Sequence, residues 1–104
     1  MNIPDTIKIG AHIVRIIIAE EVFDKDRVPC AGMSYPYINE IQIAQQYAKK
    51  ELPESAIADT LLHETLHIVS EIYGIGLREA QVMAIAGALL QVIRDNKLDF
   101  SGRE

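Results

Sequence analysis

The spacing of the hydrophobic residues changes near residue 52, and this change limits the possible folds more than any other feature of the sequence. Before it, β-branched residues alternate or cluster in short segments such as Thr6–Ile9 and His12–Ile18. After it, apolar residues recur three and four positions apart, at Ala56, Ile57, Leu61, Leu62, Leu66, Ile68, Val69 and Ile72. The chain is therefore predicted to form strands first and helices second, an α+β arrangement.

The first half, residues 1–50, is predicted to contain two β-hairpins. Gly10-Ala11 can form the turn of the first hairpin. A second pair of strands is expected over residues 31–35 and 40–43, with Pro36 and Asn39 marking the turn. Together the hairpins predict a small antiparallel sheet.

The second half is predicted to contain two core helices. Pro53 suits a first helical position, so the first helix is expected over residues 52–73. Gly74-Ile75-Gly76 can end that helix in the left-handed conformation. A second amphipathic helix is expected over residues 77–96. With 104 residues in total, the chain is long enough for one modest core, so residues 1–104 are expected to form one domain.

Composition excludes several classes of function. The net charge is -5 and the ten Lys and Arg residues are scattered, so no basic stripe is available to follow a phosphate backbone. Direct nucleic-acid binding is not expected. Cys30 is the only cysteine, which excludes an intramolecular disulfide and fits a reducing compartment. Because the sequence has neither a secretion-signal pattern nor an apolar segment that could span a bilayer, we expect a cytoplasmic protein without a membrane partner.

The first predicted helix contains His63-Glu64-Thr65-Leu66-His67, an H-E-x-x-H motif. Residues four apart on a helix lie only about 40° apart around its axis, so the two imidazoles can occupy two corners of a tetrahedral zinc site. Glu64 lies about 100° from His63 and can flank the metal without binding it. There it could accept a proton from a water that the metal activates. The alternative is a pair of histidines with a purely structural role.

A catalytic zinc site with one open position needs a third protein ligand. Glu71 and Asp59 each lie one turn from the motif on the same unbroken helix, where a carboxylate would be at the limit of its reach. Glu79 follows the glycine-containing connection, and a helix that turns back at an angle could carry it to the metal. Glu79 is equally well explained as an acidic residue in a first helical turn. Residue spacing alone therefore leaves the third ligand open.

The second helix carries a more specific pattern. Glu79-x-x-Val82-x-x-Ile85-Ala86-x-x-Leu89-Leu90 resembles the helix that follows H-E-x-x-H in ImmA/IrrE-type metallopeptidases. Leu66 and Val82 stand where those proteins commonly have Gly and Ala. Most of the chain is similar instead to a group of minimal zincin-like proteins of phages and prophages. The shared segments are Ile7–Gly10, Glu40–Ile43, Thr60–His67 and Leu89–Asn96.

This resemblance implies a zincin-like metalloprotease fold of the gluzincin type. It implies one Zn(II) per chain, held by His63, His67 and Glu79, with Glu64 as the catalytic base. It also implies that the strand Glu40–Ile43 borders the cleft and pairs with an extended peptide. The expected function is that of a zinc-dependent metallopeptidase, although a site of two imidazoles and one carboxylate also accepts Fe(II) or Mn(II).

Two alternatives to the peptidase remain. In the first, the chain is a non-catalytic phage accessory or interaction module in which the metal only staples the two helices together. In the second, no metal binds and the Ile and Leu face of the helical pair contacts a partner. The sequence identifies no protein or peptide substrate, and an oligomer is possible because so small a chain offers only a shallow groove. Candidates for stabilising an oxyanion are His12, Tyr35, Tyr37 and Tyr73.

Overall fold

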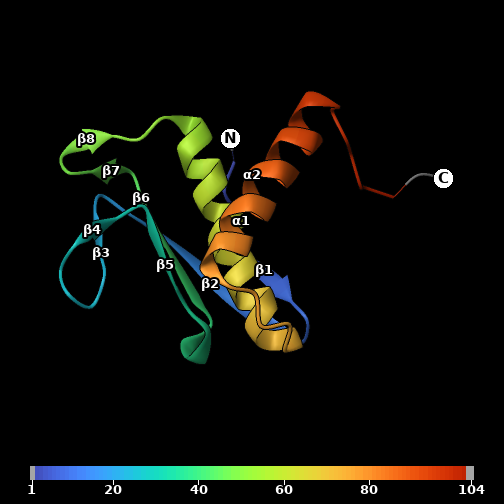
Figure 1. Cartoon of the computed structure of the whole chain (residues 1–104), viewed down its shortest axis with the longest axis horizontal. Helices are drawn as coiled ribbons and strands as arrows, with labels where there is room; N and C mark the ends of the chain where they lie inside the picture. The colour runs from blue at the N-terminus through green and yellow to red at the C-terminus, as the bar shows by residue number, and fades with distance from the viewer. Residues whose placement is uncertain (1, 103–104) are drawn as a thin grey trace.

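Four strands form one sheet, and two helices pack beside it (Figure 1). The structure is a computed structural model that describes residues 2–102. The strands of the sheet are β1 (Thr6–Ile9), β2 (His12–Ala19), β5 (Gly32–Tyr35) and β6 (Glu40–Ala44). The helices are α1 (Glu54–Tyr73) and α2 (Glu79–Asp95). This arrangement confirms the predicted α+β class.

Both predicted hairpins form, but the prediction of an antiparallel sheet is wrong. The strand order is β1-β2-β6-β5, and β2 runs parallel to β6, with Ile16 opposite Ile41. The sheet is therefore mixed. The cause lies in the second hairpin: β6 carries Ile41 and Ile43, which are fully buried, whereas β5 carries Gly32 and Ser34 on the same face. The more apolar strand takes the central position beside β2, and the strand with small residues takes the edge.

Smaller elements complete the chain between the strands and helices. They are the ribbon of β3 (Val22–Phe23) with β4 (Pro29–Cys30), the ribbon of β7 (Gln46–Tyr47) with β8 (Lys50–Glu51), and the short 3-10 helix η1 (Pro36–Ile38). Asn39 follows η1 with a φ of 51°, a left-handed conformation that asparagine tolerates better than most residues. The turn predicted at Pro36 and Asn39 is therefore confirmed.

The helices begin and end close to their predicted positions. Pro53 has an extended backbone and caps α1, so it precedes the helix instead of being its first residue as predicted. Gly74 ends α1 with a φ of 63°, as the glycine pattern indicates. Helix α2 begins two residues later than predicted, because Leu77 and Arg78 still belong to the connection.

The core lies between the sheet and α1, and it determines how α1 is rotated. Its buried residues are Ile9, Val14, Ile16, Ile41, Ile43 and Ile68. Ile68 comes from α1 and has no exposed surface. Glu64 lies one turn earlier on the same face, so the packing of Ile68 directs Glu64 toward the sheet as well. His63 and His67 are then turned to the side of α1.

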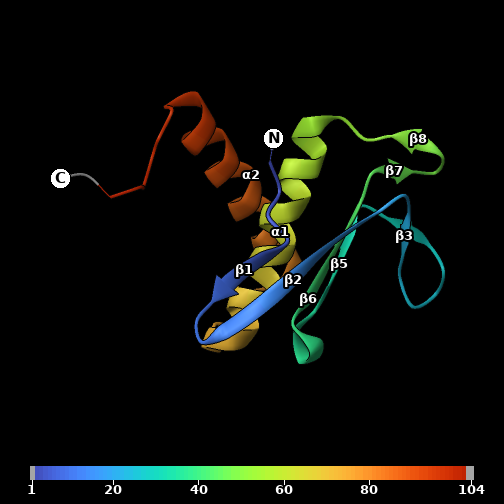
Figure 2. The same cartoon turned by 180° about the vertical axis from the view of Figure 1, so that it is seen from behind.

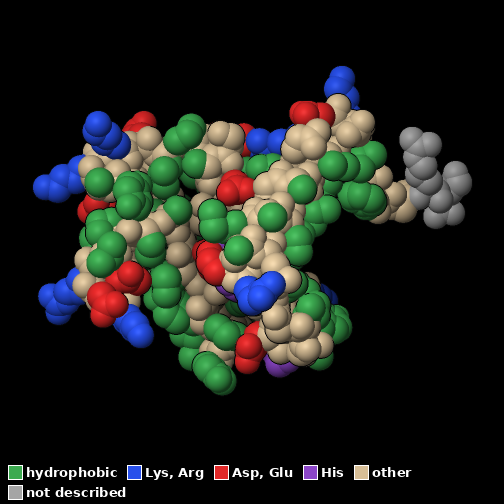
Figure 3. Space-filling view, viewed as in Figure 1, with side chains coloured by type: hydrophobic (Ala, Val, Ile, Leu, Met, Phe, Trp, Pro, Cys, Tyr) green, Lys and Arg blue, Asp and Glu red, His purple; other side chains and the backbone are tan. Residues whose placement is uncertain are grey.

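The rear view shows β1 and β2 in front of α1 (Figure 2). On the face shown in Figure 3, the Lys and Arg side chains lie mainly around the edge, apart from one another. Within residues 2–102, neither helix combines the length and hydrophobicity needed to cross a bilayer.

Candidate metal centre

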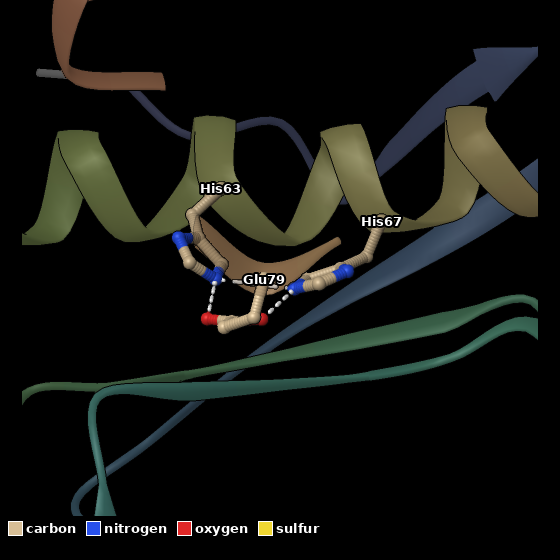
Figure 4. Close-up of side chains that lie close together, drawn as sticks. All are labelled: His63, His67 and Glu79. Carbon is tan, nitrogen blue, oxygen red and sulfur yellow. Dashed lines mark hydrogen bonds and ion pairs between the residues drawn. The ribbon is translucent and has the colours of Figure 1, made fainter. Parts of the chain in front are cut away.

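Three side chains from the two helices converge beside the sheet: His63 and His67 from α1 and Glu79 from α2 (Figure 4). The Nε2 atom of His63 lies 2.8 Å from Oε1 of Glu79, and Nε2 of His67 lies 2.7 Å from Oε2. The two Nε2 atoms are 3.2 Å apart. The structure thus brings together the three residues that the family resemblance implies as ligands.

The imidazole spacing and the ligand chemistry of this group fit a zinc ion, and the Nε2–Oε contacts of 2.7 and 2.8 Å would open to admit it. Two nitrogens bound to one tetrahedral zinc lie about 3.3–3.4 Å apart, since each Zn–N bond is about 2.0–2.1 Å long. The observed imidazole separation is close to this value. Two imidazoles and one carboxylate also form the ligand set of many catalytic zinc sites. The Glu79 side chain is 62% exposed, so the group is open to solvent on one side.

The connection between the helices places Glu79 at this position. Gly74 and Gly76 both adopt positive φ values, which lets the chain reverse within the five residues between the helices. The buried Ser70 stabilises this connection through two hydrogen bonds. Its hydroxyl accepts one from the Leu77 amide at 2.8 Å, and its backbone carbonyl accepts one from the Ile75 amide at 2.9 Å. Sequence reasoning missed Ser70, whose only signal is a serine one turn before a Gly-x-Gly segment.

Neither of the other candidate ligands belongs to this group. Glu71 is exposed beside the connection, and Asp59 lines a hollow near His63. In the part of the chain that the structure describes, His63, His67 and Glu79 are the one group whose ligating atoms all lie within 4.8 Å of one another. An angled crossing of α1 and α2 (Figure 1) therefore brings in Glu79 instead of either carboxylate of α1.

Glu64 is buried between the histidines and strand β5. Burial raises the pKa of the Glu64 carboxyl above its ordinary value, while nearby His63 and His67 and a side-chain hydrogen bond from Ser34 act in the opposite direction. A carboxyl with a raised pKa is better matched to proton transfer near neutral pH. Ser34 was not predicted, because its contact depends on how closely β5 approaches α1.

Gly32 permits that close approach. A Cβ atom at this position would lie 2.5 Å from Cγ2 of Thr60, 2.9 Å from the carbonyl oxygen of Gln42 and 3.2 Å from Cγ of Glu64. A larger residue therefore cannot fit without moving the strand or the helix. The sequence signal for this contact is the pair of small residues, Gly32 and Ser34, at alternate positions of one strand.

The strand that borders the site is β5, and the prediction of Glu40–Ile43 for this role is wrong. That segment belongs to β6, which is paired with β2 on one side and β5 on the other. Gly32, Met33 and Ser34 of β5 line a hollow of about 270 Å³ together with the histidines, Glu64 and Glu79. Strand β5 is also one of the two edge strands of this sheet, in which it pairs with β6 alone.

The four predicted oxyanion candidates lie outside this hollow. His12, Tyr35, Tyr37 and Tyr73 are absent from the residues that line it. Tyr37 is almost fully exposed on η1, and Tyr73 lies beside the Gly10 turn at the end of α1.

Comparisons with protein-family models, with curated proteins and with solved structures found no match to this chain. The resemblance to minimal zincin-like proteins therefore stays a prediction from the sequence motifs.

Proposed function

We propose that this protein is a small zinc-dependent peptidase in which His63, His67 and Glu79 hold one Zn(II) and Glu64 is the general base. The observation that carries the proposal is the convergence of two imidazoles and a carboxylate next to a second, buried carboxylate. The ligands would hold the ion, and the buried carboxylate would transfer protons.

When bound, zinc would lower the pKa of a water and polarise the carbonyl of the substrate. Glu64 takes a proton from the attacking water and passes it to the amine that leaves. The hydroxyl of Ser34 lies beside Glu64 and favours the charged form of its carboxylate. An extended peptide can pair with the outer edge of β5, which would place one of its carbonyl groups in the hollow between this strand and α1.

One observation favours a second function. Glu79 bridges both histidines, so a metal at this position ties α2 to α1. In a non-catalytic module the metal would act by stabilising the fold, because a metal that binds only the folded chain favours the folded state. Both functions use His63, His67 and Glu79, and they differ in their need for Glu64.

Metal content tests the site directly. We expect one zinc per chain in the wild type and in Glu64→Gln, and far less in His63→Ala and Glu79→Ala. Elemental analysis of protein purified without an affinity tag measures this content and identifies any other metal. Glu71→Ala is the matched control, since it removes an exposed carboxylate of α1 outside the cluster. Full metal content in Glu79→Ala, or none in the wild type, would contradict the proposed site.

Ser70→Ala is expected to weaken metal binding without changing a ligand. The Leu77 amide loses its buried acceptor, which costs about 1 kcal/mol, and the freer connection holds Glu79 less firmly. We expect the zinc affinity to fall by about 2- to 10-fold. Competition with a zinc chelator measures the affinity, and urea unfolding of the metal-free protein measures the stability. Ser55→Ala, at an exposed position of α1, should change neither quantity. If Ser70→Ala also leaves both unchanged, Ser70 does not position Glu79.

A further inference from the structure

An apolar groove lies on the opposite side of α1 from the metal centre. Strand β1, helix α1 and the C-terminal half of α2 enclose its volume of about 640 Å³. Its apolar lining includes Leu61, Leu62, Val69, Leu90 and Ile93. Two basic residues border it: Arg94, which pairs with Glu54, and Lys8, which is exposed and alternates with Ile7 and Ile9 along β1.

Helix α2 has more apolar surface than the rest of the chain covers. Only Val82 and Ala86 of this helix are buried. Beyond them α2 separates from α1 (Figure 1), and Leu89 and Val92 stay exposed while Leu90 and Ile93 face the groove. A helix with so broad an apolar face is usually covered by other protein.

The accessible surface of the whole chain leads to the same conclusion. It measures 7351 Å², whereas a compact monomer of 11.6 kDa is expected to expose about 5,800 Å². The excess is about 1,500 Å². A standard protein–protein interface removes about 800 Å² from each partner. The chain therefore has enough surplus surface for a stable dimer.

The segment that follows α2 matches the groove in chemistry. Leu98 and Phe100 project from it, with 79% of Phe100 exposed, and the segment leads away from both helices (Figures 1 and 2). On or beside the segment lie Asp95, Lys97 and Asp99, whose charges largely cancel, so its match with the groove is apolar. A groove and a complementary segment on one chain satisfy the requirement of a two-fold symmetric interface.

We propose that a second copy of this chain covers the groove, with the Leu98–Phe100 segment of each copy lying in the groove of the other. Leu98 and Phe100 then contact Leu61, Leu62 and Leu90 of the partner copy. This dimer depends on neither the metal nor peptide hydrolysis, because the groove and the metal centre lie on different sides of α1.

Sedimentation velocity of the full chain over a series of concentrations tests the dimer. We expect a species of twice 11.6 kDa in the wild type. Phe100→Ser and Leu90→Lys should each raise the dissociation constant about tenfold or more. Phe100→Ser keeps the test valid if Leu90→Lys fails to fold, because so exposed a side chain contributes little to the fold of one copy.

Ile13→Ser is the matched control, since it removes a side chain that is 59% exposed on the other face of the sheet and should leave the dimer intact. A wild type that is monomeric at every concentration would overturn the proposal. So would a dimer that withstands Phe100→Ser, or one that Ile13→Ser weakens equally. Metal content measured on the same samples separates this result from a failure of the proposed metal site.

Discussion

Replacing Glu64 by glutamine is expected to lower the rate of peptide hydrolysis by about 10²- to 10⁴-fold while the metal stays bound. The amide of glutamine has nearly the shape of the carboxylate but cannot accept the proton of the attacking water. Glu64 is not among the three residues whose ligating atoms converge, so its replacement leaves the ligands in place. Mass spectrometry of unstructured protein substrates, with and without a chelator, measures the cleavage.

The matched control is Glu71→Gln, which changes an exposed carboxylate of the same helix and should keep full activity. Equal cleavage by the wild type and Glu64→Gln would disprove the role of Glu64 as the base. A wild type that holds zinc yet cleaves nothing would instead support the non-catalytic module, in which the metal only joins α1 to α2.

Gly32→Ala is expected to lower the free energy of unfolding by about 1–3 kcal/mol. The new methyl group would overlap Thr60 and the backbone of Gln42, and a backbone carbonyl cannot move aside as a flexible side chain can. Strand β5 would have to shift away from α1 and carry Ser34 away from Glu64. Because small domains are only marginally stable, a loss of this size is readily measured by urea unfolding.

Gly87→Ala is the control, because the same change from glycine to alanine is expected to stabilise the protein there. Gly87 lies in α2 with nothing within 4 Å of the position that a Cβ atom would occupy. Alanine is the better helix former there, so this substitution should raise the free energy of unfolding by about 0.5–1 kcal/mol. If Gly32→Ala is as stable as the wild type, β5 does not depend on glycine for its approach to α1.

The local features of the fold could be predicted because they depend on neighbouring residues. Hairpin turns and helix ends follow from Gly10, Asn39 and Gly74, whose backbone conformations do not require the rest of the chain. The parallel pairing of β2 with β6 could not be predicted in this way. It depends on which strand of the second hairpin buries Ile41 and Ile43, a contact between distant segments.

The residues of the candidate site likewise fall into those that local spacing predicts and those that depend on contacts between distant segments. His63 and His67 are related by helical spacing, so the sequence places them together directly. Glu79 could be selected only through the resemblance of the second helix to a known pattern, because its approach depends on the angle between two helices. Ser34 and Ser70 were missed, since each acts through a hydrogen bond to a residue that only the fold brings close.

Val82 and Ala86 are the buried residues of helix α2, the Arg94–Glu54 ion pair joins its last turn to α1, and its two ends lie at surfaces on opposite sides of α1. A single helix thus supplies a ligand to the metal centre at its first residue and lining residues to the groove near its last turn, so two surfaces on different sides of α1 share one structural support.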